Sequence, residues 1–302
     1  MLKSINFEII DICNLRCSMC DIWKNKVKNT ISVFDIEKIT DSKHFSIDTN
    51  ITITGGEPLL HPEIKEIFQI IHDKGLQVHT LSTNGVLYNK LEELLMYCIY
   101  KDIEIPNIHI SIDGMEEAHD LQRGIKGSFM KSIDTIILLK KSYKNINIKI
   151  KYTITKNNIE DIKKVYALAH KLGVEIDFKA VENDEYYTNR INKPLLLDKT
   201  DKQMVINILR SIYRNSLYGN NLIHYLEFGK LRFKCTTPNY NLFVMANGDT
   251  YCCTKYDKIG NLKKQSLDEI YYNETHMDII THVNKINCSK CYSLHGSFKS
   301  VI

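Results

Sequence analysis

The sequence predicts an α/β fold: a partial (β/α)6 TIM-type barrel followed by a small C-terminal metal-binding segment. The first observation is an alternation of strand and helix patterns up to about residue 181, which indicates parallel βαβ units. The second is that glycine and polar motifs stand at the ends of the expected strands, where parallel barrels carry their chemistry. The third is that all nine cysteines except Cys98 fall in two clusters, near the two ends of the chain.

The elements follow from local patterns in chain order. Apolar and β-branched runs predict strands at residues 3–10, 49–58, 76–85, 105–114, 146–155 and 174–181. Apolar residues at helical spacing predict helices at 32–42, 61–75, 88–101, 127–144 and 157–173. Six such units suit an incomplete barrel or a doubly wound sheet, and we expect the barrel.

The pattern changes after residue 182. Residues 183–200 are expected to form a connection and residues 201–215 one more helix. Asn247-Gly248 between two short apolar runs predicts a β-hairpin. We therefore expect three parts, which are a barrel at 1–182, a linker with a helix at 183–229, and a small domain at 230–302.

Composition excludes several classes of function. The net charge of +4 is spread without a long basic block, so no nucleic-acid partner is expected. No apolar run is long enough to span a membrane, and the N-terminus reads as a strand instead of a signal peptide. We therefore expect a cytoplasmic protein, in whose reducing compartment clustered cysteines indicate a metal or catalysis.

Cys13, Cys17 and Cys20 form a C-x3-C-x2-C motif directly after the first expected strand. A tetrahedral zinc site needs a fourth ligand nearby, but the next cysteine is Cys98. A four-iron cluster held by three thiolates keeps one iron open for a small molecule. A fragment of a structural zinc site is the alternative.

These three cysteines resemble the CxxxCxxC motif of radical S-adenosylmethionine (radical SAM) enzymes. The resemblance implies a [4Fe–4S] cluster whose open iron is chelated by SAM. It also implies that the reduced cluster cleaves SAM to a 5′-deoxyadenosyl radical, which takes a hydrogen atom from the substrate. An external one-electron reductant of the flavodoxin or ferredoxin type is then needed.

Further motifs up to about residue 181 support this resemblance. Gly55, Gly56 and Glu57 are similar to the family's GGE motif, in which the glutamate would hold the amino group of SAM. Arg123 resembles an arginine that pairs with the SAM carboxylate. The remaining residues assigned to SAM by resemblance are Ser82, Asn84, Ser111, Asp113 and Met19, the last standing where an aromatic residue is often found near adenine.

The second cysteine set resembles a twitch domain, the shortened form of the SPASM extension. Its pattern implies four ligands for one fully coordinated auxiliary [4Fe–4S] cluster, namely Cys235, Cys253, Cys288 and Cys291. Ser297 stands where a later cysteine is expected in the full extension. A zinc knuckle is the alternative.

Cys252 and Cys98 are left without a place in either cluster. Adjacent residues of a strand point to opposite faces, so either Cys252 or Cys253 reaches the metal, and the spacing after Gly248 favours Cys253. Cys252 is then a candidate hydrogen donor to a substrate radical. Cys98 on the expected helix at 88–101 reads as a buried small hydrophobe.

The expected function is the oxidation of a small or carbohydrate-like substrate, since a fully ligated second cluster suits the removal of an electron. The expected start of the barrel by Ser4, with no peptide-recognition domain before it, favours a small substrate over a peptide. Three alternatives remain: a ribosomal-peptide maturase, an epimerase that uses Cys252, and a non-enzymatic iron–sulfur or zinc protein. Tyr186, Tyr187 and Arg190 are candidates for lining the substrate pocket.

Overall fold

The computed structural model describes residues 1–182, 193–213 and 216–292, and a nine-stranded sheet forms its centre. The six expected strands are present and pair in parallel. Their bounds are β1 Ser4–Glu8, β2 Asn50–Thr54, β3 Val78–Thr83, β4 Asn107–Ser111, β5 Ile148–Ile154 and β6 Glu175–Ala180.

The strand order distinguishes the two architectures that the sequence allowed. The six strands lie in the order β6-β5-β4-β3-β2-β1, without the reversal that defines a doubly wound sheet. The fold is therefore a partial barrel, and the sheet is not closed. All six carboxyl ends meet at one rim, which is where the expected site residues stand.

The two faces of the barrel sheet differ in polarity. In β5 the burial alternates residue by residue, as expected for side chains that point to opposite faces. One face carries apolar side chains such as Ile5, Phe7, Ile51 and Ile53, which are fully buried in the main core. This is the face that the helices cover, and the opposite face is more polar.

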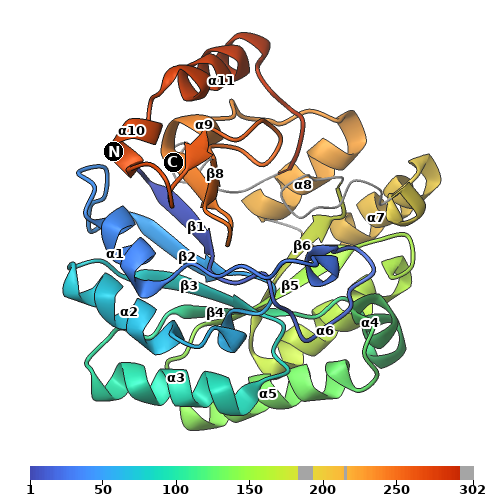
Figure 1. Cartoon of the computed structure of the whole chain (residues 1–302). Helices are drawn as coiled ribbons and strands as arrows, with labels where there is room; N and C mark the ends of the chain where they lie inside the picture. Colours follow the sequence, from blue (N-terminus) through green and yellow to red (C-terminus); the bar gives the residue numbers. More distant parts are fainter. Residues whose placement is uncertain (183–192, 214–215, 293–302) are drawn as a thin grey trace.

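The helices of the barrel alternate with its strands and surround it (Figure 1). Their bounds are α1 Val33–Thr40, α2 Ile64–Asp73, α3 Tyr88–Tyr100, α4 Glu116–Arg123, α5 Ser128–Ser142 and α6 Ile162–Leu172. Short 3-10 turns lie at η1 Ile22–Lys24, η2 Pro58–Leu60, η3 Ile159–Asp161 and η4 Lys193–Leu195. All of the expected helices are present, and α4 is an addition.

The C-terminal region continues the barrel sheet. The expected hairpin exists as β7 (Asn241–Val244) and β8 (Asp249–Tyr251), with Gly248 in the turn at φ +87°. In addition, β7 pairs in parallel with β1, so that Ser4 faces Asn241. A short β9 (Gly260–Asn261) completes the far edge. One hydrophobic core runs from Leu2 to Tyr292 and joins the two regions.

The C-terminal half contains more helix than the sequence analysis expected. Its helices are α7 Lys199–Ile212, α8 Leu217–Phe228, α9 Thr237–Tyr240, α10 Leu267–Ile270 and α11 Glu274–Ile286. No helix was predicted for residues 230–302 beside the hairpin, whereas α11 lies over the hairpin region in Figure 1. Asn273 caps the first turn of α11 through its side chain, and Asn287 ends it in the left-handed conformation, so capping signals were present in the sequence.

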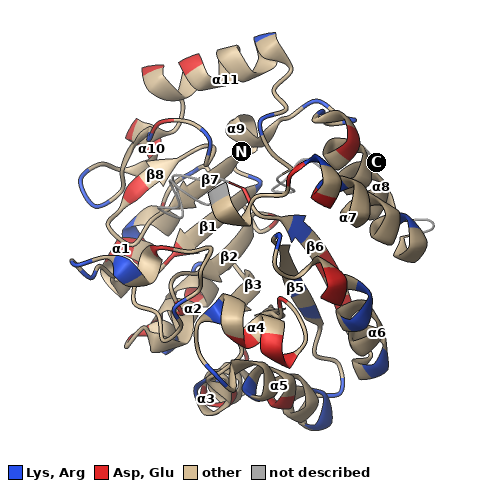
Figure 2. Cartoon of the chain, turned by 90° about the vertical axis from the view of Figure 1, so that its right-hand side faces the viewer, with Lys and Arg blue, Asp and Glu red and all other residues tan. Residues whose placement is uncertain are grey.

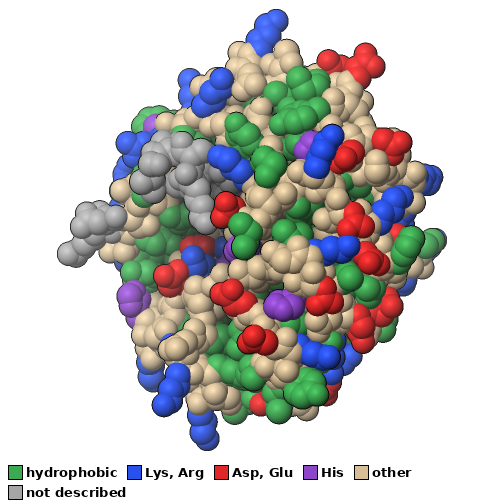
Figure 3. Space-filling model, turned by 90° about the vertical axis from the view of Figure 1, so that its left-hand side faces the viewer, with side chains coloured by type: hydrophobic (Ala, Val, Ile, Leu, Met, Phe, Trp, Pro, Cys, Tyr) green, Lys and Arg blue, Asp and Glu red, His purple; other side chains and the backbone are tan. Residues whose placement is uncertain are grey.

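The surface carries mixed charges. On the face shown in Figure 3, acidic and basic side chains of the described residues are interspersed among apolar ones. Figure 2 shows acidic residues gathered on α4, which carries Glu116, Glu117 and Asp120. Within the described parts of the chain, no helix has the length and apolarity needed to cross a membrane.

Candidate active site

A cavity of about 280 Å³ opens at the carboxyl rim of the barrel, and we call it the mouth cavity. Cys13, Cys17 and Cys20 all line it, although they lie on a loop and not on a strand. The other lining residues that the sequence analysis singled out are Met19, Gly55, Gly56, Ser82, Asn84, Ser111 and Arg123. Residues far apart in the sequence thus meet at one site.

The glycine pair lets the three-cysteine loop (residues 13–20) approach β2 closely. The N–H of Gly56 donates to the carbonyl of Ile10 at 2.7 Å, and that of Glu57 donates to Ile12 at 2.9 Å. A Cβ at Gly56 would lie 2.4 Å from the Ile12 oxygen and 3.1 Å from the Cβ of Cys13. The glycines therefore position the cysteine loop as well as lining the cavity.

Glu57 stands behind the cavity wall, and its side chain is not among the lining groups. One carboxylate oxygen accepts from Thr83 Oγ1 at 2.8 Å and from the N–H of Leu59 at 3.2 Å, and the other accepts from the N–H of Asn84 at 2.8 Å. Burial raises the pKa of Glu57 to about 7, against the lowering effect of these donors. In this arrangement Glu57 ties β2 to the end of β3, and its contact with an ammonium group remains a prediction.

Asn84 connects the end of β3 to the cysteine loop. Its side-chain amide donates to Asn14 Oδ1 at 2.8 Å, and its own Oδ1 accepts from the N–H of Val86 at 2.9 Å. The predicted contact of Asn84 with ribose remains a prediction. Ser82 and Ser111 line the cavity beside it.

Arg123 stands between the cysteine loop and a buried carboxylate. Its Nη2 lies 2.5 Å from Asp113 Oδ2, and its Nη1 donates to Cys17 Sγ at 3.8 Å. Asp113 is fully buried, and its other oxygen accepts from the N–H of Thr153 at 2.7 Å. Arg123 lines the mouth cavity, whereas Asp113 is not a lining residue and pairs with Arg123 from outside the cavity. A SAM carboxylate is the predicted additional partner of Arg123 inside the cavity.

The end of α4 holds the cysteine loop in place. The N–H of Arg16 donates to the carbonyl of Arg123 at 3.0 Å, and that of Ser18 donates to Gln122 at 2.8 Å. This helix was not predicted, although Glu116 and Glu117 in its first turn and Gly124 after its end are typical boundary signals.

Burial disfavours the charged form of the thiols in the cysteine loop. Burial raises the pKa of Cys13 to about 11 and that of Cys20 to about 12, and it also raises the pKa of Cys17. Metal ligation requires thiolates, so binding of a cluster would release protons from this loop.

Met19 and Trp23 line the mouth cavity close to the three cysteines in the sequence. Met19 is buried with Leu15 and Val181 in a small apolar cluster. Its contact with adenine remains a prediction. The indole N–H of Trp23 donates to the carbonyl of Cys17 at 3.2 Å, and Trp23 lines the cavity. Trp23 was missed because a single tryptophan near a cysteine motif carries no pattern of its own.

The sequence analysis also missed lining residues at the ends of β5 and β6. Thr153, Lys179 and Glu182 line the mouth cavity and occupy the same rim as the predicted motifs. Extending the strand-end argument to β5 and β6 would have identified them. Tyr186, Tyr187 and Arg190, which were candidates for the substrate pocket, lie outside the described residues, as does Ser297.

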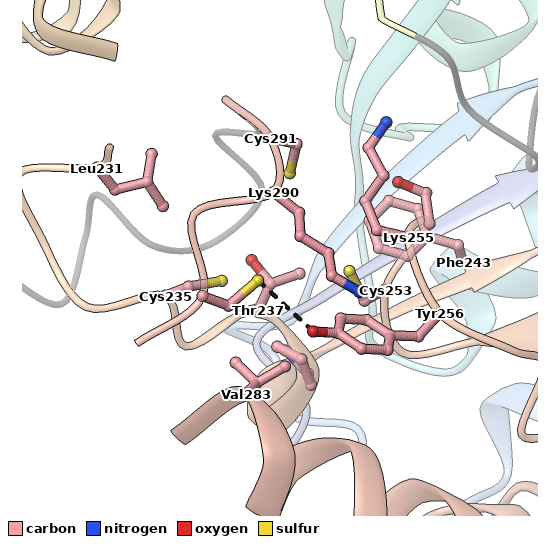
Figure 4. Close-up of a pocket in the computed structure, with 13 residues that line it drawn as sticks. Leu231, Cys235, Thr237, Phe243, Cys253, Lys255, Tyr256, Val283, Lys290 and Cys291 are labelled. Atoms are coloured by element: carbon pink, nitrogen blue, oxygen red, sulfur yellow. Dashed lines mark hydrogen bonds between the residues drawn. The ribbon is translucent and has the colours of Figure 1, made fainter. Parts of the chain in front are cut away.

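A second cavity in the C-terminal region brings the other cysteine set together (Figure 4). Cys235, Cys253, Cys288 and Cys291 all line it, and they come from three separate segments of the chain. Burial raises the pKa of Cys291 to about 12. We call this the C-terminal cavity.

Polar and charged side chains surround these cysteines. The hydroxyl of Tyr256 donates to Cys288 Sγ at 3.6 Å, which is the dashed contact in Figure 4. The Nζ of Lys290 lies 4.1 Å from the centre of the Tyr256 ring. A hydroxyl donor and a nearby ammonium both suit a ligand sulfur that carries negative charge.

Cys252 and Cys253 directly follow β8 and differ in their relation to the C-terminal cavity. Cys253 lines the C-terminal cavity, whereas Cys252 is fully buried in the main hydrophobic core. Cys252 lines neither of the two cavities, so the structure gives no support to its candidate role as a hydrogen donor. Cys98 is likewise fully buried in the core, on α3.

The donor sets fit iron–sulfur clusters. Each cavity is lined by cysteine thiols, three in one and four in the other, and in the mouth cavity the buried Nε of Arg123 lacks a hydrogen-bond partner. Among the described residues, no three His, Cys, Asp or Glu side chains converge on a single metal-ion position. The fold and the two cavities together define an iron–sulfur protein of the partial-barrel type.

The comparison with protein families makes the assignment specific. The family model of the radical SAM superfamily matches residues 7–175, and the chain belongs to that superfamily. The model of an iron–sulfur cluster-binding domain, SPASM, matches residues 235–292. Membership implies a SAM-binding [4Fe–4S] cluster, and the second match implies iron–sulfur binding in the C-terminal region.

Curated relatives of different activities resemble the chain. It is 36 % identical over 180 residues to an AdoMet-dependent heme synthase of Methanosarcina barkeri, covering 57 % of this chain and 48 % of the relative. It is 32 % identical over 171 residues to the subtilosin biosynthesis protein AlbA of Bacillus subtilis, covering 56 % and 37 %. The sporulation killing factor maturation protein SkfB of the same species is 31 % identical, covering 57 % and 41 %. The chain thus spans less than half the length of these relatives.

Solved structures share this fold over most of the chain. Streptococcus suis SuiB bound to S-adenosylmethionine superimposes with a TM-score of 0.70 at 15 % identity, covering 93 % of this chain and 68 % of that one. The solved structure of native anSMEcpe with bound AdoMet gives a TM-score of 0.70 at 20 % identity, covering 93 % of this chain and 83 % of that one. At these identities the likeness shows the fold alone.

Proposed function

We propose that the chain is a radical SAM enzyme that oxidises its substrate by removing a hydrogen atom at the mouth cavity. The observation that carries this proposal is the pair of cysteine-lined cavities joined by one continuous sheet, one with three thiols and one with four. When bound, the first cluster and SAM would supply the radical that removes the hydrogen atom; the second hydrogen would leave as a proton, and the second cluster would supply an acceptor for the remaining electron.

The residues of the chain have distinct roles in this proposal. Cys13, Cys17 and Cys20 hold the first cluster, while the Gly55-Gly56 backbone, Ser82, Asn84, Ser111 and Arg123 surround SAM. Asp113 fixes the guanidinium of Arg123. Cys235, Cys253, Cys288 and Cys291 hold the second cluster. An external one-electron reductant of the flavodoxin or ferredoxin type starts each cycle.

Metal analysis and product mass test this proposal together. After anaerobic reconstitution we expect about eight irons per chain, falling to about four in a Cys13/Cys17/Cys20 triple-Ala variant. Oxidation then predicts a product two mass units lighter than the substrate, formed together with 5′-deoxyadenosine. If the wild type holds only about four irons per chain and the triple-Ala variant holds none, the chain has no second cluster, and the argument for oxidation fails.

A second candidate function is the maturation of a ribosomally made peptide. The similarity to AlbA and SkfB, whose names give them biosynthetic or maturation roles for peptides, supports this candidate. Both candidates share the same chemistry at the mouth cavity and differ in the substrate. Peptides and small alcohols with deuterium at the reacting carbon separate them, because only the true substrate transfers deuterium into 5′-deoxyadenosine.

A further inference from the structure

Glu182 is placed between the two cavities. It follows β6 at the carboxyl rim of the barrel and lines the mouth cavity, where it is the single carboxylate among the described lining residues. The mechanism proposed above gives it no role. Because an isolated buried carboxylate is costly, its partners show what it does in this position.

Both partners of Glu182 belong to the C-terminal cysteine segments. Its Oε1 accepts from the N–H of Tyr292 at 3.0 Å, and its Oε2 lies 3.4 Å from the Nζ of Lys255. Tyr292 directly follows Cys291, and Lys255 stands two positions after Cys253. One carboxylate at the barrel rim is thus connected to two of the three segments that carry the second cysteine set.

The ion pair is shielded from water. The side chains of Lys255 and Glu182 are only 11 % and 15 % exposed, so the charges act in surroundings of lower polarity than water. Lys255 lines the C-terminal cavity, and in Figure 4 its amine points away from Cys253. The ammonium group of Lys255 therefore extends from the C-terminal cavity and pairs with Glu182 at the rim of the barrel.

Glu182 lies close to Cys291 in the fold. Its Oε1 accepts from the backbone N–H of Tyr292 at 3.0 Å, and Tyr292 is the residue directly after Cys291. A neighbouring anion disfavours negative charge on a thiolate, and it equally disfavours an added electron on a cluster held by that thiolate. A neighbouring cation has the opposite effect.

We propose that Glu182 is a positioning residue shared by the two sites. With Lys255 it fixes the C-terminal cysteine segments against the mouth of the barrel, and its negative charge lowers the reduction potential of the second cluster. This inference rests on the proposed function, because it requires that cluster.

Redox titration of the reconstituted full chain, followed by electron paramagnetic resonance without substrate, tests the proposal. Glu182→Gln keeps an acceptor for Tyr292 and removes the charge, so the second cluster should shift to a higher potential. Lys255→Met removes the opposite charge and should shift it to a lower one. Glu175→Gln is the matched control, because Glu175 begins β6, the strand that Glu182 follows, but its exposed carboxylate pairs with Lys149; this variant should leave the potential unchanged.

The outcomes separate this inference from the function on which it rests. Opposite shifts for Glu182→Gln and Lys255→Met support it, and Lys255→Met carries the test alone if the Glu182 variant does not fold. An unchanged second-cluster potential in both variants overturns the positioning role. A wild-type protein without a second cluster signal overturns the proposed function first, and the inference with it.

Discussion

The two cysteine sites of this protein are built in different ways. Cys13, Cys17 and Cys20 come from one short loop, whereas the four cysteines of the C-terminal cavity come from three segments that the fold must bring together. The first site is a local motif held against the barrel by backbone contacts. The second depends on the hairpin, on α11 and on the chain that follows it. A local motif can be recognised in a sequence, while an assembled site needs tertiary structure.

Cys17→Ala is expected to give the largest effect and to affect the first cysteine site without the second. This change removes one of three ligands and the sulfur that Arg123 contacts. We expect SAM cleavage to fall below detection and iron to fall from about eight to about four per chain. Cys98→Ala, in the core of α3, is the control and should keep both clusters. A Cys17→Ala variant that still makes 5′-deoxyadenosine would refute the assignment.

Cys288→Ala should have the complementary effect. It removes a ligand of the C-terminal cavity and the acceptor of the Tyr256 hydroxyl. We expect loss of about four irons, with SAM cleavage retained and oxidised product lost. Iron analysis and 5′-deoxyadenosine assays measure the two parts. If all iron disappears, the sites do not assemble independently, and the contrast between them is incorrect.

Gly56→Ala tests whether the backbone contact with the cysteine loop matters for the first site alone. The added Cβ would press on Ile12 and Cys13, so we expect a loss of about 1–3 kcal/mol in unfolding free energy and a reduced content of first-site iron. Gly75→Ala is a suitable control, because its Cβ meets nothing within 4 Å and only the left-handed backbone costs about 1–2 kcal/mol. Equal iron content in the two variants would contradict the positioning role.

Glu8→Gln tests whether Glu8, a buried residue of β1 that contacts the hairpin region, is protonated in the folded protein. Glu8 ends β1, its Oε1 accepts from the N–H of Ala246 at 3.4 Å, and burial raises its pKa to about 8. The folded state then keeps a proton that the unfolded state loses above about pH 4.5, so stability falls between about pH 4.5 and 8. Glutamine carries no such charge. Thermal unfolding should show the variant equal to wild type near pH 5 and more stable near pH 8; no gain at pH 8 would show that Glu8 is ionised in the fold.

Cys252→Ala should have the smallest effect. The side chain is buried in the core outside both cavities, so we expect about 1 kcal/mol of lost stability and unchanged hydrogen transfer. Deuterium incorporation from heavy water into the product is the measurement. A variant that stalls with a substrate radical would restore the hypothesis that Cys252 is a hydrogen donor.

The fold and the first site were largely accessible from the sequence. Alternating periods identified all six barrel strands, and the CxxxCxxC motif is local enough to need no tertiary information. The β7–β8 hairpin followed from Asn247-Gly248. These features depend on residues that are close together along the chain.

The remaining features depend on contacts over long distances in the sequence. No local pattern indicates that β7 pairs with β1, or that Glu182 meets Lys255 and Tyr292. The buried positions of Glu57 and Asp113 were also missed, because a motif specifies a residue but not the direction of its carboxylate. Helix α4 was missed although its boundary signals were present.

The pairing of β1 with β7 has a consequence for how the protein is made. Ser4 meets Asn241, so one edge of the first strand has no partner until most of the chain has left the ribosome. An exposed strand edge is a template for aggregation, and contacts between distant parts of a chain form slowly. The N-terminal half is therefore expected to emerge as an aggregation-prone folding intermediate that chaperones protect. This state should last until β7 is synthesised and pairs with the free edge of β1.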